Sequence, residues 1–88
     1  MLINVARGSV VDQDELIYSL QNNVILAAGL DVYVNEPNIP KELIDLKNTV
    51  LLPHVASATV ETRNAMGQLV FDNIENFFEG KPLISPVV

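Results

Sequence analysis

The chain has 88 residues, a formal net charge of −6, one histidine and no cysteine. The excess of acidic residues argues against nucleic-acid binding and against a polybasic membrane-surface protein, because both need clustered Lys or Arg. The lack of cysteine excludes disulfide frameworks, thiolate zinc sites and thiol nucleophiles, and a single histidine supports no metal site. A hydrophobic content of 49% predicts a folded chain, as one small domain too short for a two-domain enzyme. Nothing at the N-terminus indicates a targeting signal, so we expect a cytoplasmic location.

The first part of the chain predicts a strand, a helix and a second strand. Residues 2–5 form a short apolar run typical of a buried strand, and the glycine of Arg7-Gly8 indicates a turn. Asp12 is a predicted helix N-cap, with an acidic residue three positions later at the capping-box spacing, and two consecutive asparagines end the helix. Residues 24–30 are continuously apolar and predict a strand buried on both faces, as in parallel sheets covered by helices.

The second part predicts a short helix, a third strand and a long helix. Pro40 suits the first position of the short helix, and residues 49–52 predict a strand that Pro53 ends. Thr59 is a predicted cap for the long helix, which Gly80 ends, before an extended apolar tail. Its apolar residues follow the helical period and predict one apolar helix face: Met66, Leu69, Val70, Ile74, Phe77 and Phe78.

The alternation of strands and helices predicts an α/β fold with a short parallel sheet. Because three strands make a thin sheet, we expect the unit to be part of a larger doubly wound sheet. Polar residues follow each strand: Arg7 follows the first, Asp31 ends the second with Glu36 five residues beyond it, and His54 follows the third. Ligands of parallel sheets bind beyond the carboxyl ends of the strands, so we expect these side chains to converge at one edge.

The convergence favours a functional site over the ordinary structural role that each residue has alone. Arg7 has the planar fork that grips a carboxylate, and a His54–Glu36 pair can deliver a proton to a carbonyl oxygen. Together these groups suit the reduction of a 2-keto acid, for which a nicotinamide has to supply the hydride. The four glycines do not have the G-x-G-x-x-G spacing, so the sequence predicts no pyrophosphate-binding loop.

At these residues the chain resembles the D-isomer-specific 2-hydroxyacid dehydrogenases, with most similarity to their glyoxylate/hydroxypyruvate reductase branch. The similarity lies in the ordered set Asn4-x-x-Arg7-Gly8, Leu30-Asp31-Val32-x-x-x-Glu36-Pro37 and Pro53-His54. It implies a partial Rossmann-like three-layer unit: residues 1–79 as the C-terminal half of a NAD(P)-binding domain, and residues 80–88 as the start of a return segment to a missing substrate domain. The helix that Thr59 begins would lead back toward that domain.

The resemblance also implies roles for individual residues. Arg7 would bind the substrate carboxylate, His54 would be the general acid and base, and Glu36 would be its acidic partner. The cofactor, NAD or NADP with the preference left open, would contact one set of residues: Val5, Ala6, Arg7, Asp31, His54, Val55, Ala56 and Ser57. The substrate would be a small 2-keto or 2-hydroxy acid and the full-length enzyme a homo-oligomer, whereas the 88 residues alone are expected to be an inactive fragment.

Two other interpretations stay open from the sequence. A half-sheet exposes an edge strand and apolar surface, so the chain is alternatively a non-catalytic module that oligomerises or complements a partner fragment. A receiver-type regulatory domain is less favoured, because it needs an acidic pair after the first strand, where this chain has Arg7.

Overall fold

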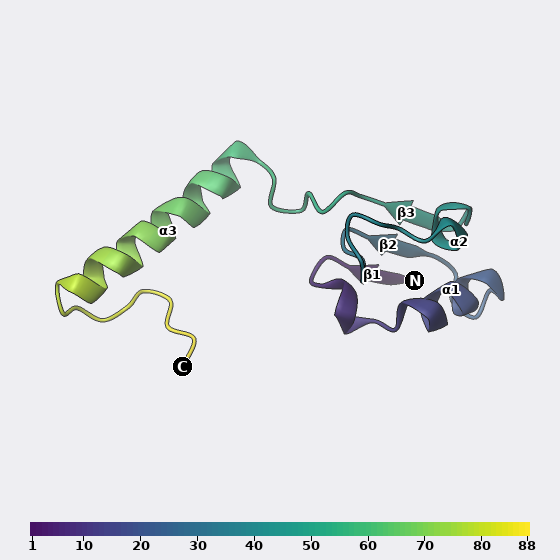
Figure 1. The fold of residues 1–88 in the computed structure, drawn as a ribbon, viewed down its shortest axis with the longest axis horizontal. Helices are drawn as coiled ribbons and strands as arrows, with labels where there is room; N and C mark the ends of the chain where they lie inside the picture. The colour runs from purple at the N-terminus through teal and green to yellow at the C-terminus, as the bar shows by residue number, and fades with distance from the viewer. The chain divides into compact units, whose positions relative to one another are not determined.

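The computed structural model describes all 88 residues, which form two units, residues 1–56 and 57–88. The order of elements agrees with the predicted alternation (Figure 1). The first unit contains β1 (Leu2–Asn4), a 3-10 helix (Gly8–Val10), α1 (Gln13–Gln21), β2 (Ala28–Leu30), α2 (Lys41–Ile44) and β3 (Thr49–Leu51), and the second contains α3 (Val60–Phe78). No helix combines the length and the hydropathy that a membrane span requires. The predicted domain boundary at residue 79 stays a prediction.

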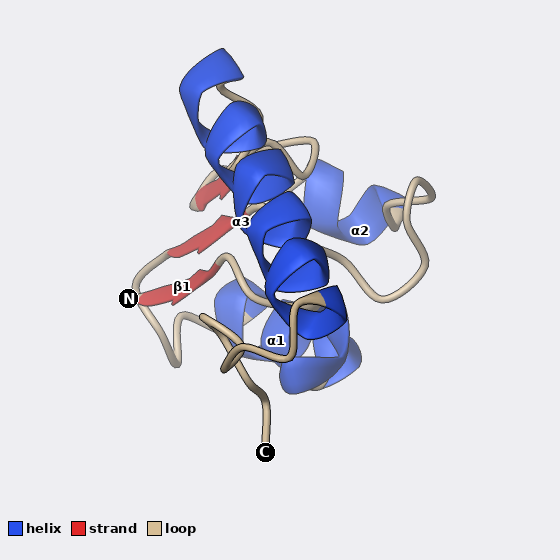
Figure 2. Ribbon diagram, turned by 90° about the vertical axis from the view of Figure 1, so that its left-hand side faces the viewer, coloured by secondary structure: helices blue, strands red, loops and turns tan.

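The three strands form a parallel sheet in the order β1-β2-β3, which confirms the predicted α/β class. The register places Ile3 opposite Gly29 and Gly29 opposite Val50. Helices α1 and α2 lie in the two crossovers and on the same side of the strands (Figure 2). Because all strands run the same way, their carboxyl ends meet at one edge, where the chain turns into the loops that carry the polar residues.

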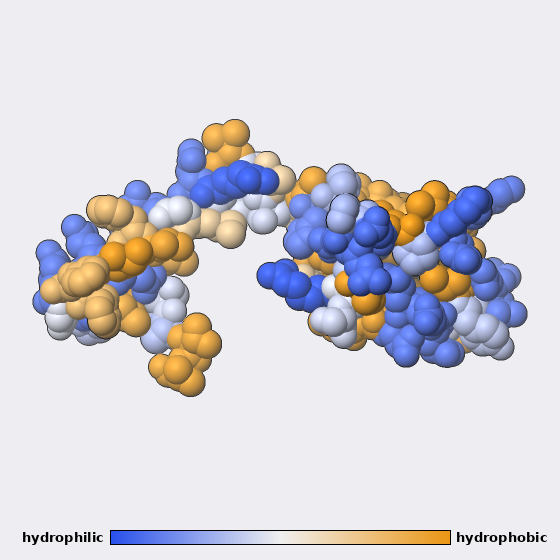
Figure 3. Space-filling model, in the orientation of Figure 1, coloured by the Kyte–Doolittle hydropathy of each residue, from blue (hydrophilic) through white to orange (hydrophobic).

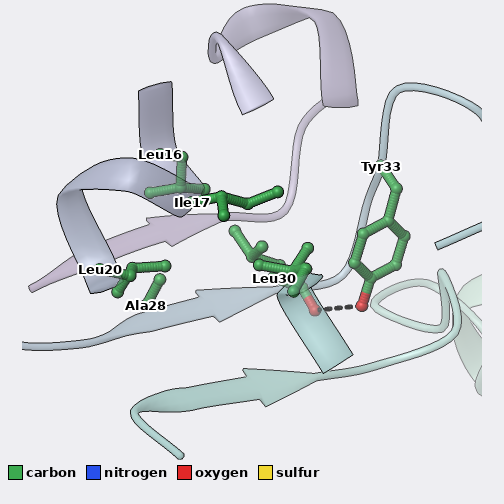
Figure 4. Close-up of a cluster of buried hydrophobic side chains, with 7 residues drawn as sticks. Leu16, Ile17, Leu20, Ala28, Leu30 and Tyr33 are labelled. Atoms are coloured by element: carbon green, nitrogen blue, oxygen red, sulfur yellow. Dashed lines mark hydrogen bonds between the residues drawn. The ribbon is translucent and has the colours of Figure 1, made fainter. Parts of the chain in front are cut away.

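The core of the first unit lies between this sheet face and the two helices. Its buried side chains come from α1, β2, α2 and the loop after β2 (Figure 4): Leu16, Ile17, Leu20, Ala28, Leu30, Tyr33 and Leu43. Leu43 of α2 has no exposed area, although its helix is only four residues long. The short helix therefore depends on packing, since so short a segment is not stable alone.

The opposite face of the sheet is apolar, and no other element of residues 1–56 covers it. Ile3 is 67% exposed and Val50 is 64% exposed, and both alternate along their strands with residues that face the core. The prediction that residues 24–30 form a strand buried on both faces is therefore wrong. Only Ala28–Leu30 is a strand, because Asn23 takes a left-handed conformation with φ 55° and the N–H of Val24 donates to Ser19, which places a turn after α1.

The predicted ends of α1 and α3 are confirmed, whereas Pro40 caps α2 and is not its first residue, since α2 begins at Lys41. The Asp12 carboxylate accepts the N–H of Glu15 at 3.1 Å, and the Thr59 hydroxyl accepts the N–H of Thr62 at 3.1 Å. These side chains satisfy amides that have no partner within the helix. Gly80 follows α3 with φ 68°, the left-handed conformation that glycine adopts without a steric penalty.

The apolar face predicted for the long helix exists, but it is not buried. α3 contains no buried residue, and Phe77 is 68% exposed. Apolar side chains are correspondingly visible on the surface of the second unit (Figure 3). The helical period therefore predicted the amphipathic character of α3 correctly, and within residues 57–88 no other element covers its apolar face.

Candidate active site

A histidine–glutamate pair forms the centre of the polar edge. Nδ1 of His54 lies 2.6 Å from Oε2 of Glu36. A carboxylate accepts hydrogen bonds only, so Nδ1 carries the proton in this contact. The hydrogen bond from His54, and after it the one from the Tyr33 N–H, holds the pKa of Glu36 below its usual value. The contact also leaves Nε2 as the ring nitrogen that is free for exchange with a ligand.

Glu36 is fixed by its second oxygen as well. Its Oε1 accepts the backbone N–H of Tyr33 at 2.9 Å. The carboxylate thus bridges the loop that follows β2 and the imidazole that follows β3. A carboxylate with both oxygens engaged orients the ring more strictly than a single contact would.

The loop that carries His54 is held by a buried carboxylate. Asp31 is only 1% exposed, and its two oxygens accept the N–H groups of Val55 and Ala56, both at 2.8 Å. The hydrogen bond from Val55 is the largest cause that lowers the pKa of Asp31. His54 itself has a φ of 56°, which a residue with a Cβ rarely adopts. Because Asp31 binds the N–H groups of the next two residues, it stabilises the strained backbone conformation of His54.

Arg7 is presented by a turn that Asn4 shapes. The Asn4 side chain donates to the carbonyl of Arg7 at 2.9 Å and accepts the N–H of Ala6 at 3.1 Å. The exposed guanidinium donates to the Ala6 carbonyl at 2.6 Å. The Arg7 main chain is therefore held by Asn4, one terminal nitrogen of the guanidinium (Nη1) is engaged by Ala6, and the remaining N–H donors stay available to an anion.

Arg7, Glu36 and His54 line one open cavity of about 390 Å³. Three different strand ends thus deliver a guanidinium, a carboxylate and an imidazole to the same place, as the parallel order led us to expect. A second, apolar cavity of about 480 Å³ follows the uncovered sheet face, and Val5 and Asp31 are among the residues that line it. Val5 and Asp31 both line this cavity, and their predicted contact with the cofactor stays a prediction.

The other predicted cofactor residues are less informative. Ala6 is exposed in the turn before Arg7, and Val55 and Ala56 use their N–H groups to bind Asp31. Ser57 begins the second unit. The part of the prediction that assigns cofactor contacts to these residues stays a prediction.

Sequence reasoning missed Gly8 as a structural requirement. A Cβ built on Gly8 would lie 2.1 Å from the carbonyl carbon of Tyr33. Only glycine permits this approach between the turn after β1 and the loop after β2. The sequence marks a turn at Arg7-Gly8, but it does not show that another backbone passes there.

A parallel sheet with helical crossovers, and with a His–Glu pair and an arginine beyond the carboxyl ends of its strands, defines an α/β domain whose site lies at the strand ends. Residues 1–56 match the model of the D-isomer specific 2-hydroxyacid dehydrogenase family, NAD binding domain. The chain belongs to this family and carries part of its NAD-binding domain, as the resemblance in the sequence predicted.

Individual relatives agree with this assignment. The chain is 54% identical over 88 residues to glyoxylate/hydroxypyruvate reductase A of Arabidopsis thaliana, with all of this chain and 28% of that protein covered. It is 53% identical over 87 residues to 2-ketogluconate reductase of Gluconobacter oxydans, covering 99% of this chain and 28% of the relative.

A solved structure is similar over the same length. The NADPH-dependent glyoxylate/hydroxypyruvate reductase of Sinorhizobium meliloti, in complex with NADP and malonate, has a TM-score of 0.90 and 52% identity, over 99% of this chain and 28% of that one. The chain thus spans about 28% of the length of the relatives it matches.

Proposed function

We propose that the chain supplies the catalytic side chains of an NAD(P)-dependent reductase that converts 2-keto acids to D-2-hydroxy acids. The single observation that carries this proposal is the 2.6 Å His54–Glu36 contact in a cavity that Arg7 also lines. A proton donor and a carboxylate-binding group at one place are what the reduction of a 2-keto acid requires from the protein.

The residues divide the work as follows. Arg7 binds the substrate carboxylate through paired N–H donors, which fixes the keto carbon within the cavity. His54, protonated on both nitrogens, donates from Nε2 to the keto oxygen as charge develops there. Glu36 stabilises the imidazolium through Nδ1 and keeps the ring from rotating. In the reverse direction the neutral Nε2 accepts the hydroxyl proton.

A bound nicotinamide supplies the hydride for this reaction. Val5 and Asp31, which follow β1 and β2 at the carboxyl edge of the sheet, are proposed to lie beside the nicotinamide. The remainder of the dinucleotide would be held by residues outside these 88, so the chain alone is proposed to be inactive. The names of the relatives support small keto acids such as glyoxylate and hydroxypyruvate as substrates. We further propose a cytoplasmic homo-oligomer for the complete enzyme.

The proposal is tested in a chimera in which this chain replaces the 88 aligned residues of the Arabidopsis reductase. We expect the chimera to oxidise NADH or NADPH in the presence of glyoxylate or hydroxypyruvate, measured at 340 nm as the nicotinamide absorbance. The isolated chain at the same concentration is expected to show no turnover. A folded chimera that binds the cofactor but reduces neither keto acid would contradict the proposal.

A second candidate is a module that associates with another copy of itself. The exposure of Ile3 and Val50 on the bare sheet face favours it, because monomers rarely expose a contiguous apolar surface of this kind. Light scattering of the 88-residue chain tests this second candidate, which does not exclude the first. A concentration-dependent dimer supports the module, and a compact monomer at high concentration contradicts it.

A further inference from the structure

Tyr33 lies in the loop between Asp31 and Glu36, and the proposed mechanism gives it no role. It occupies the loop directly after β2, and it is only 5% exposed. Its ring packs in the core with the side chains of α1 and β2, and its hydroxyl points toward the end of β2 (Figure 4). A tyrosine buried this deeply needs a hydrogen-bond partner for its hydroxyl.

The hydroxyl joins the ends of two strands. The backbone pairing between β2 and β3 finishes with the N–H of Leu52, which donates to the carbonyl of Leu30 at 2.8 Å. Beyond that bond, the Tyr33 hydroxyl lies 2.8 Å from the carbonyl of Leu52 and 3.1 Å from the carbonyl of Leu30. The phenol therefore extends the connection between the strands by one further hydrogen bond, from a residue 19 positions away in sequence from Leu52.

The backbone of the same residue holds the glutamate. The N–H of Tyr33 donates to Oε1 of Glu36, whose Oε2 contacts Nδ1 of His54, two residues after Leu52. The contacts thus form a closed circuit from Tyr33 through Glu36 and His54 to Leu52 and back to Tyr33. Two of its links belong to Tyr33, one from the main chain and one from the side chain.

The chemical state of the phenol suits this role. Burial is the largest cause that raises the pKa of Tyr33, and the nearby carboxylates Asp31 and Glu36 raise it as well. The hydroxyl therefore stays protonated and remains a donor to a carbonyl across the pH range in which the pair works.

We infer that Tyr33 is a positioning residue, whose hydroxyl fixes the backbone that leads to His54 relative to the backbone that carries Glu36. Its catalytic consequence rests on the proposed function, whereas its geometric consequence does not. The alternative is that Tyr33 is only a core residue that fills space. The substitution Tyr33→Phe separates the two, because phenylalanine keeps the ring and its packing but removes the donor to Leu52.

The geometric consequence is measured on the single histidine of the chain. The ¹⁵N chemical shifts of its imidazole report which nitrogen carries the proton when the ring is neutral. In the unsubstituted chain we expect the Nδ1–H form to dominate, because Glu36 accepts from that nitrogen. In Tyr33→Phe we expect the shifts to move toward the Nε2–H form, which a histidine without a partner at Nδ1 favours.

Tyr18→Phe is the matched control. Tyr18 is the only other tyrosine, and it is 56% exposed on α1. Its substitution is expected to leave the imidazole shifts unchanged. Unchanged shifts in a folded Tyr33→Phe chain would overturn the inference, because the ring alone would then hold the pair in place.

The catalytic consequence is measured in the chimera with the Arabidopsis reductase. Tyr33→Phe is expected to lower kcat by about tenfold to a hundredfold, the range for a reacting group misplaced by about 1 Å, with a smaller change in KM for the keto acid. Tyr18→Phe is expected to change neither constant. If Tyr33→Phe does not fold as an 88-residue chain, the kinetic measurement in the chimera alone tests the inference, and an unchanged kcat overturns it. An unsubstituted chimera without activity contradicts the proposed function instead, and the imidazole shifts still decide the role of Tyr33.

Discussion

The backbone of Gly8 lies so close to that of Tyr33 that a methyl group on Gly8 would be 2.1 Å from the Tyr33 carbonyl carbon. This contact joins the turn that presents Arg7 to the loop that holds Glu36. We expect Gly8→Ala to force the two segments apart. The new methyl group would clash with main-chain atoms of Tyr33, which cannot move aside as a flexible side chain would. The variant should lose at least about 1–3 kcal/mol of unfolding free energy.

Urea denaturation measures this loss, and Gly67→Ala is its control. A Cβ on Gly67 meets no atom within 4 Å, and the residue lies inside α3. That substitution should raise the helicity of the chain or leave it unchanged, because alanine favours helix over glycine by about 0.5–1 kcal/mol. Equal stability of Gly8→Ala and the unsubstituted chain would show that the close approach is absent in solution.

The two carboxylates of the site predict how stability changes with pH. The pKa values of Asp31 and Glu36 are lowered in the folded state, chiefly by hydrogen bonds from Val55 and His54 respectively. The unfolded chain therefore binds protons more readily, so the unfolding free energy rises with pH through the carboxylate range. The contribution of these groups is complete above their unfolded pKa values and is lost as the pH falls through the folded ones.

The slope of unfolding free energy against pH is obtained from denaturation midpoints at pH values between about 2 and 7, the range in which carboxylates titrate. Asp31→Asn should flatten it, because the amide does not titrate. The control Asp72→Asn changes a partly exposed carboxylate of α3, which accepts a hydrogen bond from Gln68 and contacts no residue of the site. An identical slope in Asp31→Asn and the unsubstituted chain would contradict the role of the buried carboxylate.

The exposed face of α3 predicts small stability effects. Because Phe77 is 68% exposed, Phe77→Ala should change the unfolding free energy of the chain by less than about 0.5 kcal/mol. Leu20→Ala, at a residue that is 2% exposed in the core, should cost about 2–5 kcal/mol. A large loss in Phe77→Ala would mean that the ring is covered in solution, by this chain or by another copy.

The substrate-binding role of Arg7 predicts an effect on KM. In the chimera with the Arabidopsis reductase, Arg7→Lys keeps the charge but loses the paired donors, so KM for glyoxylate should rise about tenfold or more. Steady-state kinetics at saturating NADPH measures it. Arg63→Lys in α3 is the control and should leave KM unchanged. An unchanged KM in Arg7→Lys would mean that another group binds the substrate carboxylate.

The sequence predicted the order of the elements, the caps at Asp12 and Thr59, and the meeting of Arg7 with His54 at one sheet edge. These features depend on local patterns and on the parallel order of strands, which short-range rules describe well. The prediction that residues 24–30 form one buried strand was wrong, because a run of apolar residues does not show what covers each face of a strand. The contacts of Gly8 and Tyr33 could not be predicted, since each depends on a segment distant in sequence.

The role of His54 also predicts that removing its imidazole lowers activity strongly and stability only slightly. The imidazole is half exposed and contacts one carboxylate, so His54→Ala should lower the unfolding free energy by no more than about 1 kcal/mol, the loss of one solvent-exposed ion pair. A strongly destabilised variant would instead assign the histidine to the structural framework.

The most direct measurement of the central claim is kcat for glyoxylate reduction by the chimera with and without His54. If His54, paired to Glu36 at 2.6 Å, is the proton donor, His54→Ala should lower kcat by about a hundredfold to ten-thousandfold while cofactor binding and stability persist. An active chimera whose kcat is unaffected by His54→Ala would contradict the account.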